Sequence, residues 1–156
     1  MEIRKANLKD LKDIDEIYVT SCIDEVRMQF PKRPRKNIER ELVKWKKDRL
    51  KGFRKDILSK NNYWVVVEEK EKIVGFGEAV ISKRDKKTAD ITMVYLKKDF
   101  RKRGIGSKIM NELLRWLRKK KVKFVSGGAF VKNKPSLSLC KKFGFGIVAV
   151  RMEKKL

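Results

Sequence analysis

Hydrophobic residues in the first thirty positions recur mostly at helical spacing. A short strand is predicted at Ile3, and Asn7, with Asp10 three residues later, has the pattern of a helix N-cap. The helix that follows is predicted to fade before Pro31. Its apolar face comprises Leu11, Ile14, Ile17, Tyr18, Ser21 and Cys22.

A second amphipathic helix is predicted after the loop marked by Pro31 and Pro34. Apolar residues recur at helical spacing through residues 36–58 on a strongly basic background. They are Ile38, Leu42, Trp45, Leu50, Phe53 and Ile57. We therefore expect one continuous helix with an apolar stripe toward the core.

The middle of the chain changes to runs that are rich in β-branched and aromatic residues. Strands are predicted at Tyr63–Glu68, Ile73–Ser82 and Ala89–Leu96, with polar turns at residues 69–72 and 84–87. Because the connecting turns are short, the three strands are expected to form an antiparallel meander.

The last third of the chain alternates helices and strands. Ile105, Ile109, Leu113 and Leu117 repeat every four residues, which predicts a helix over Gly104–Lys119. Three further elements are expected: a strand at Phe124–Val131, a short helix at Pro135–Lys142 that Gly144 ends in the left-handed conformation, and a closing strand at Phe145–Met152. No internal repeat or linker favours a second domain, so residues 1–156 are expected to form a single α/β domain.

Composition narrows the possible chemistry. The 156 residues include 43 Lys and Arg, 20 Asp and Glu, and no histidine, which gives a formal net charge of +23. The absence of histidine excludes Ser-His and Cys-His nucleophiles and His-containing zinc sites. Any general base must therefore be a carboxylate, Lys, Tyr, Cys or an ordered water. The excess charge is concentrated in residues 32–60 (+9), 97–123 (+10) and 124–156 (+6).

The two cysteines and the apolar runs bear on the expected location of the protein. Cys22 and Cys140 have no CxxC spacing, and the amino terminus lacks the apolar stretch of a signal peptide. The chain is therefore expected to be cytoplasmic, with free thiols. Residues 64–67 and 144–150 are much shorter than the roughly 20 residues of a membrane-spanning helix, so no insertion into a membrane is expected.

The most informative stretch is residues 91–108, where a predicted strand enters a basic, glycine-containing turn and then a helix. Backbone N–H groups at the amino end of a helix have no partner within the helix, and glycine lets an anion approach the backbone closely. This order predicts an anion-binding turn. The alternative is that Gly104 and Gly106 only shape the turn.

This stretch resembles the acetyl-coenzyme A signature of the GNAT superfamily of N-acetyltransferases, (Gln or Arg)-x-x-Gly-x-(Gly or Ala), which Arg101-x-x-Gly104-x-Gly106 matches. Further features occur in the family's order: Asn133, Ser136, the pair Gly144-Phe145, and the ending at residues 152–156. The resemblance covers residues 73–156 well and the first strand and helix loosely. It implies a mixed, mainly antiparallel sheet that is flanked by helices and splayed between the fourth and fifth strands. It also implies acetyl-CoA as co-substrate, without a metal.

The resemblance assigns the coenzyme contacts residue by residue. It implies that backbone amides of the turn hold the pyrophosphate, with the Arg101 side chain beside it; the turn residues concerned are Arg101, Lys102, Arg103, Gly104, Ile105, Gly106 and Ser107. The main chain of Val94, Tyr95 and Leu96 would pair with the pantetheine arm. Asn133 would also contact the coenzyme, and the alternative is an Asx turn that leads into the next helix.

Proton transfer has three candidate residues. An acceptor amine must lose a proton, and Glu78 and Asp90 lie on central strands where the family often places a carboxylate base; the alternative for both is a solvated strand face. The family's general-acid tyrosine is replaced by Cys140, whose thiol is either the acid or a small packing residue. Tyr95, a water, or departure of the thiolate without an acid would be substitutes.

The resemblance implies transfer of an acetyl group from acetyl-CoA to a primary amine by direct attack in a ternary complex. The expected partners are therefore acetyl-CoA and an amine acceptor, which is a protein amino terminus, a lysine or a small amine. The basic helix at 36–58 is a candidate surface for an acidic or protein acceptor, or for a nucleic acid, and the alternative is a solvated outer face with an apolar stripe on the core. The competing interpretation is an RNA- or ribosome-binding module that keeps the fold and has little catalysis. A monomer and a homodimer both stay open.

Overall fold

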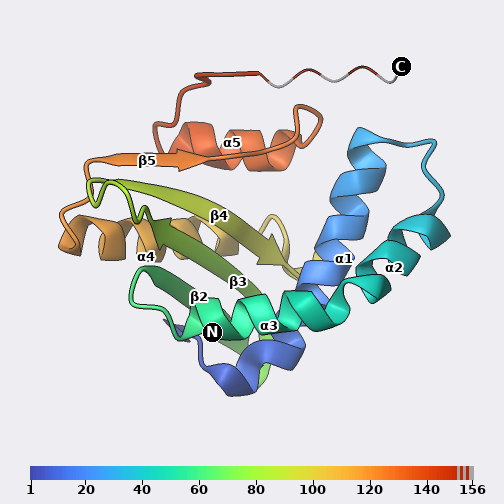
Figure 1. Cartoon of the computed structure of the whole chain (residues 1–156), viewed down its shortest axis with the longest axis horizontal. Coiled ribbons are helices and arrows are strands. Elements are labelled where there is room, and N and C mark those ends of the chain that lie inside the picture. Colours follow the sequence, from blue (N-terminus) through green and yellow to red (C-terminus); the bar gives the residue numbers. More distant parts are fainter. Residues whose placement is uncertain (151, 153, 155–156) are drawn as a thin grey trace.

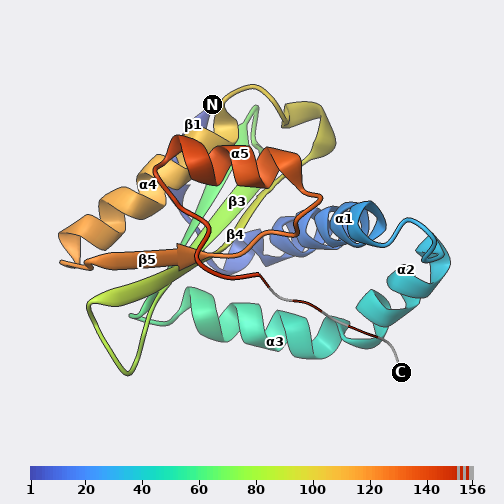
Figure 2. The same cartoon turned by 90° about the horizontal axis from the view of Figure 1, so that it is seen from above.

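A computed structural model describes residues 1–150, 152 and 154. It contains one five-stranded sheet in the order β1-β2-β3-β4-β5, with helices on both faces (Figure 1 and Figure 2). The strands are β1 (Glu2–Lys5), β2 (Asn62–Glu69), β3 (Lys72–Ile81), β4 (Thr88–Leu96) and β5 (Phe124–Gly127). The helices are α1 (Leu11–Gln29), α2 (Arg35–Lys44), α3 (Lys46–Ile57), α4 (Ile105–Lys119) and α5 (Lys134–Lys142), with 3-10 turns η1 (Leu8–Asp10) and η2 (Lys98–Phe100).

The sheet is mixed and mainly antiparallel, as predicted. Strands β1 to β4 pair antiparallel in sequence order, which confirms the predicted meander, and β5 adds parallel to β4. A parallel neighbour needs a crossover, and α4 supplies it. The carboxyl ends of β4 and β5 therefore lie at the same end of the sheet.

The two faces of the sheet carry separate hydrophobic cores. On one face, the predicted four-residue repeat of α4 packs against Val65, Val67, Val74 and the start of β4. On the other face, α1 and α3 cover a core around Trp64 and Phe76. Helix α4 lies so close to β3 that a Cβ added to Gly77 would be 2.4 Å from Cγ2 of Ile109. This close approach fixes the position of α4 over the sheet.

The capping prediction for the amino terminus is confirmed. The Asn7 side chain accepts a hydrogen bond from the backbone N–H of Lys9, and the Asp10 carboxylate accepts one from the Asn7 N–H at 2.9 Å. The cap opens the short turn η1, from which α1 continues. Helix α1 ends at Gln29, in agreement with the predicted stop before Pro31.

The single helix predicted over residues 36–58 is wrong. The chain breaks at Trp45, which ends α2, precedes α3 and is 56% exposed rather than buried. Arg49 explains the break: it donates to the carbonyl of Leu42 (2.8 Å), which α2 leaves unpaired at its end, and to the Asp15 carboxylate of α1 (2.7 Å). Two short helices can thus wrap around α1 where one straight helix would diverge from it.

Two predicted strands are also corrected. Strand β5 ends at Gly127 instead of Val131, and Gly127-Gly128 is a pair of residues that weakens a strand. In place of the predicted closing strand, residues 145–150 are irregular. Phe145 packs against the core on the α4 side, but the chain then leaves the sheet, and the Val148 side chain is 97% exposed. Arg151 and most of the family-like ending at 152–156 lie outside the described residues.

The helices of the described ranges are short or strongly charged. None of them combines the length and the apolar character that a bilayer crossing requires.

Candidate functional site

Strands β4 and β5 part at one point, and a cleft opens there. Their pairing runs from Thr88–Phe124 to Ile91–Gly127 and stops. At the same place β4 carries a β-bulge, because consecutive β3 residues pair with Ile91 and Met93 and leave Thr92 as the extra residue. The predicted splay between the fourth and fifth strands is thus confirmed.

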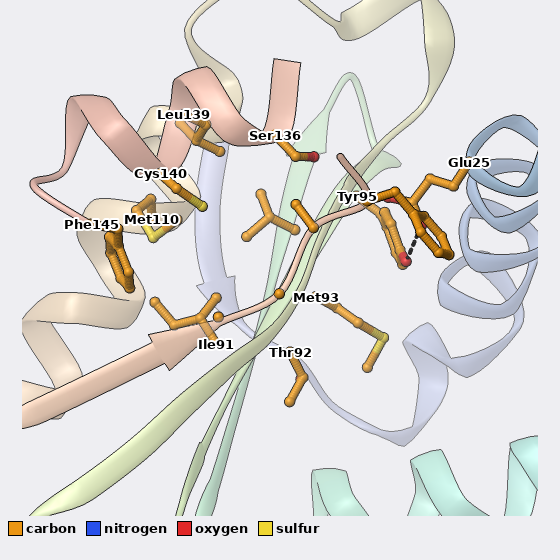
Figure 3. A pocket seen from close by; sticks show the side chains of 15 residues that line it. Glu25, Ile91, Thr92, Met93, Tyr95, Met110, Ser136, Leu139, Cys140 and Phe145 are labelled. Carbon is orange, nitrogen blue, oxygen red and sulfur yellow. Dashed lines mark hydrogen bonds between the residues drawn. The ribbon is translucent and has the colours of Figure 1, made fainter. Parts of the chain in front are cut away.

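Two adjoining cavities form this cleft. One, of about 390 Å³, lies between the diverging strands and α5 (Figure 3). The other, of about 640 Å³, extends to the amino end of α4. Both are lined by Glu25, Val94, Tyr95, Ser136 and Leu139, so they form one continuous groove. Figure 3 shows Ser136, Leu139 and Cys140 on the α5 side of this groove, across from β4.

The amino end of α4 has the features of an anion site. Lys102 and Gly104 both have positive φ (61° and 76°), and they turn the chain sharply into the helix. No side chain caps this end, so the first N–H groups, at Ile105, Gly106 and Ser107, have no partner within the helix. These groups and the positive end of the helix dipole favour an anion. A pyrophosphate fits this donor set.

The predicted side chains around that end have different environments. Arg101 donates to the Leu96 carbonyl (3.2 Å) and pairs with Asp24 of α1 (2.8 Å). Lys102 lines the larger cavity, whereas Arg103 lies over the ring of Phe100, 5.2 Å from its centre. Two further residues have distinct environments: Ile105 is buried in the core on the α4 side and lines neither cavity, and Lys142 of α5 donates to the Ser107 hydroxyl at 3.1 Å.

The free edge of β4 offers its main chain to the groove. Lys97 donates its N–H to Val74 of β3, and main-chain groups alternate between the two edges of a strand. Val94 and Leu96 therefore direct their N–H and C=O groups toward the groove, and Tyr95 directs its own toward β3. Of the three predicted strand residues, two thus present main-chain groups to the groove, and Tyr95 contributes its side chain.

Glu25 is a site residue that the sequence reasoning missed. It lines both cavities and accepts hydrogen bonds from the Tyr95 hydroxyl (2.9 Å) and the Asn133 amide (3.0 Å), as the dashed line to Tyr95 marks in Figure 3. Burial raises the pKa of Glu25, while the bonds from Tyr95 and Asn133 act in the opposite direction. A signal was present, because Glu25 follows Ser21 and Cys22 by four and three residues on the predicted apolar face of the helix.

Asn133 has two contacts in the structure. Its side-chain oxygen accepts from the N–H of Ser136 (3.2 Å) and caps α5, and its amide nitrogen donates to Glu25. The residue is buried and lines the larger cavity. The Asx-turn alternative is therefore observed, and it places Asn133 beside the groove.

Glu78 is buried beneath the groove on the face that α1 and α3 cover. Its carboxylate accepts hydrogen bonds from Thr92 and from Asn62, the latter at 2.9 Å. Burial is the main cause that raises the pKa of Glu78. Thr92 lines the smaller cavity, so its hydroxyl connects the groove to this carboxylate.

The other two catalytic candidates lie in different surroundings. Asp90 is exposed on β4 before the splay and lines neither cavity. Cys140 is half-buried at the end of the smaller cavity, near Met110 and Phe145, and burial raises the pKa of its thiol. Both cysteines are free, as predicted. Among the described residues, no group of three or more Cys, Asp or Glu side chains is placed to hold a metal.

Comparison with known proteins identifies related molecules. A family model described as the acetyltransferase (GNAT) family matches residues 20–145. A search of curated proteins finds no match.

Solved structures with the same fold have low sequence identity. A mutant of the BH1408 protein from Bacillus halodurans has a TM-score of 0.79 at 16% identity, covering 100% of this chain and 99% of that one. The PaiA N-acetyltransferase from Thermoplasma acidophilum, in complex with coenzyme A, has a TM-score of 0.76 at 18% identity over 96% and 92%. An aminoglycoside 6'-N-acetyltransferase from Acinetobacter haemolyticus has a TM-score of 0.69 at 14% identity over 100% and 99%.

Proposed function

The chain belongs to the GNAT acetyltransferase family, which uses acetyl-CoA, and from this premise we propose that it transfers the acetyl group to a primary amine. The observation that carries the proposal is the continuous groove from the uncapped end of α4, along the free edge of β4, to the splay. When bound, acetyl-CoA supplies a thioester that an unprotonated amine can attack.

Different residues of the groove would bind different parts of the coenzyme. The N–H groups of Ile105, Gly106 and Ser107 would hold the pyrophosphate, and Lys102 adds positive charge beside them. Main-chain groups of Val94 and Leu96 would pair with the pantetheine arm. Coenzyme binding would therefore use mainly main-chain groups, and it would depend on the shape of the turn more than on single side chains.

Glu78 and Thr92 form the proton path that we assign. An acceptor ammonium in the groove would give a proton to the Thr92 hydroxyl, which in turn donates its own to Glu78. Since burial raises the pKa of this carboxylate, it holds a proton more readily than an ordinary Glu. The neutral amine would then attack the thioester carbonyl: the carbon–nitrogen bond forms, the carbon–sulfur bond breaks, and the proton that the nitrogen loses passes to the departing sulfur, so that coenzyme A leaves as its thiol. Asp90 has no comparable path to the groove.

Glu25 and Cys140 receive supporting roles. Glu25 has only neutral hydrogen-bond donors, Tyr95 and Asn133, so its carboxylate can attract a cationic amine into the groove. Burial raises the pKa of the Cys140 thiol, which can donate its proton to the departing sulfur and take up the one that the nitrogen loses. The coenzyme thiol has a pKa near that of a free cysteine, about 8.5, so it can also leave as a thiolate without help.

Calorimetric titration with acetyl-CoA tests whether the coenzyme binds at the amino end of α4. Wild type should bind, and Gly104→Glu should abolish binding because it places a carboxylate where the phosphates would lie. Gly104→Ala is the matched control, since it has the same backbone strain at φ 76° without the charge. Equal loss in both variants, or no binding by wild type, would refute the anion site.

Release of the coenzyme A thiol tests whether the acetyl group is transferred to a primary amine. The assay is run with a panel of peptide amino termini, lysine side chains and small amines, and acetylated product is identified by mass spectrometry. We expect turnover with at least one primary amine. Binding of acetyl-CoA without turnover on any amine would refute acetyl transfer to amines and keep the coenzyme site.

A further inference from the structure

The positive charge of residues 97–123 lies at two opposite ends of α4. Arg101 and Lys102 precede the helix at the groove, but Arg118 and Lys119 lie in its last turn, and Lys120, Lys121 and Lys123 follow it. A helix of 15 residues is about 22 Å long. The charge at the carboxyl end is therefore too far away to serve the coenzyme phosphates, and it needs a different explanation.

Two basic loops meet at that far end. The β3–β4 loop, residues 83–87, contacts residues 118–123, which are the end of α4 and the α4–β5 loop, because the N–H groups of Lys123 and Phe124 both donate to the Lys87 carbonyl (2.8 and 3.0 Å). Both loops lie at the left of Figure 1 and Figure 2, and none of their residues lines either cavity of the groove. Their nine cations are Lys83, Arg84, Lys86, Lys87, Arg118, Lys119, Lys120, Lys121 and Lys123, which we call the basic end.

The charge of the basic end is not balanced within the described structure. All nine cations are exposed, and none has an ion-pair partner among the described residues. The loops hold one carboxylate, Asp85, which accepts from the N–H of Lys87 and so turns toward its own loop. Holding these cations together costs electrostatic energy, which a bound polyanion would relieve.

The other basic surface is partly neutralised. In the segment of residues 32–60, three of the thirteen Lys and Arg residues, Arg33, Arg35 and Arg49, each pair with a carboxylate. Four Asp and Glu residues lie in that segment, against one in the basic end. The comparison favours the basic end as the place where an external anion binds.

An aromatic ring lies beside these cations. Phe124 begins β5, directly after the basic loop, and is 68% exposed. Unstacked nucleic-acid bases stack on such rings, while lysine and arginine side chains contact the phosphates. Neither cavity of the groove includes these residues, so an extended ligand fits better than a small phosphorylated molecule.

We propose that the basic end is a docking surface for single-stranded nucleic acid, with phosphates on its lysine and arginine side chains and a base on the Phe124 ring. The surface lies at the opposite end of α4 from the groove, so this proposal does not depend on acetyl transfer. It moves the nucleic-acid contact that the sequence suggested for residues 36–58 to a different part of the molecule.

Fluorescence anisotropy with a labelled 12-nucleotide uridine oligomer, at several salt concentrations, tests the proposal. A protein with a net charge of +23 binds polyanions nonspecifically, so a control of equal charge change is essential. The basic-end variant carries Lys83→Gln, Lys87→Gln, Lys119→Gln and Lys123→Gln. The control variant carries Lys36→Gln, Lys47→Gln, Lys51→Gln and Lys55→Gln, all of them exposed on α2 and α3.

The expected result is specific to the basic end. Its variant should lose at least about tenfold in affinity, and its log–log salt slope should fall by about 3, since each lost phosphate contact on a single strand contributes about 0.7. The control should change less than about threefold. Phe124→Ser should weaken binding about fivefold or more and leave the salt slope unchanged.

Three results would overturn the proposal: equal losses in the two lysine variants, an unchanged affinity in Phe124→Ser, or equally tight binding of poly-glutamate or phosphatidylserine vesicles at the same site. Thermal unfolding of each variant is measured as a control, and a cooperative transition is required before its affinity is compared with that of wild type. Titration with acetyl-CoA should give the wild-type affinity in the basic-end variant, which separates this proposal from the proposed function.

Discussion

Gly77 of β3 provides a direct test of how α4 is positioned over the sheet. An alanine there would place its Cβ 2.4 Å from Cγ2 of Ile109 and 3.1 Å from Cδ1 of Leu113. Both residues are fully buried in the α4 core, so neither side chain can swing away. We expect Gly77→Ala to lower the free energy of unfolding by about 1–3 kcal/mol, the usual range for overpacking.

Gly52 offers a matched control. It lies within α3, and a Cβ added there meets nothing within 4 Å. Gly52→Ala should therefore raise stability by about 0.5–1 kcal/mol, because alanine loses less backbone entropy in a helix. In a chain of 156 residues, each kcal/mol shifts the melting temperature by about 2–4 °C, so the two alanines should move it in opposite directions.

The double variant Gly77→Ala with Ile109→Ala tests the assigned clash. Ile109→Ala alone should cost about 2–5 kcal/mol through the cavity that it leaves. The alanine at position 77 would partly fill that cavity, so the combined loss should be smaller than the sum by about 1–3 kcal/mol. Acetyl-CoA affinity should fall in Gly77→Ala, because α4 carries the anion-binding end. Additive losses in urea denaturation, or a Gly77→Ala protein as stable as wild type, would refute the reasoning.

Three further predictions concern buried charge and the groove. Arg49→Ala should cost about 3–5 kcal/mol because it strands the buried Asp15 carboxylate. Arg35→Ala breaks an exposed pair and should change stability far less, so similar losses on denaturation would contradict this. Burial raises the pKa of Glu78 in the folded protein, so wild type should lose stability as the pH rises from about 4.3 through that raised pKa. Glu78→Gln should lack this decline in melting scans from pH 4 to 8, and it should acetylate the amine about 10²-fold or more slowly than wild type. Cys140→Ala should lower kcat less than about tenfold, and a 100-fold loss would instead make Cys140 the general acid.

Sequence periodicity predicted the elements that have a single strong pattern. The four-residue repeat of α4 and the left-handed stop at Gly144 follow local rules, and both are found in the structure. The break at Trp45 could not be predicted in that way, because it depends on Arg49 reaching a carbonyl of one helix and a carboxylate of another. Local spacing carries no information on such long-range contacts.

The part of the site that uses backbone groups could be predicted from the sequence. The order of strand, glycine-containing turn and helix is itself a pattern in the sequence, and it indicates the amino end of α4 as an anion site. Glu25 was missed because a glutamate on a helix is usually solvated, and only the approach of Tyr95 and Asn133 shows that this one lines the groove. Likewise, Glu78 has its path to the groove through a hydrogen bond from Thr92, which strand alternation alone does not foresee.

The bulge at Thr92 reverses the faces of the sheet on which the odd- and even-numbered side chains of β4 lie. Before it, Ala89 and Ile91 belong to the core on the α4 side; after it, Met93 and Tyr95 pack on the opposite side, toward α1. Without the bulge, a strand of the same length would turn Tyr95 toward α4 and away from Glu25. Thr92 is therefore the position where β4 can lose one residue and still keep every other side chain on its present side. Among natural variants of this chain, a strand shortened by one residue at this point would preserve the Tyr95–Glu25 contact and lose the bend that accompanies the parting of β4 from β5.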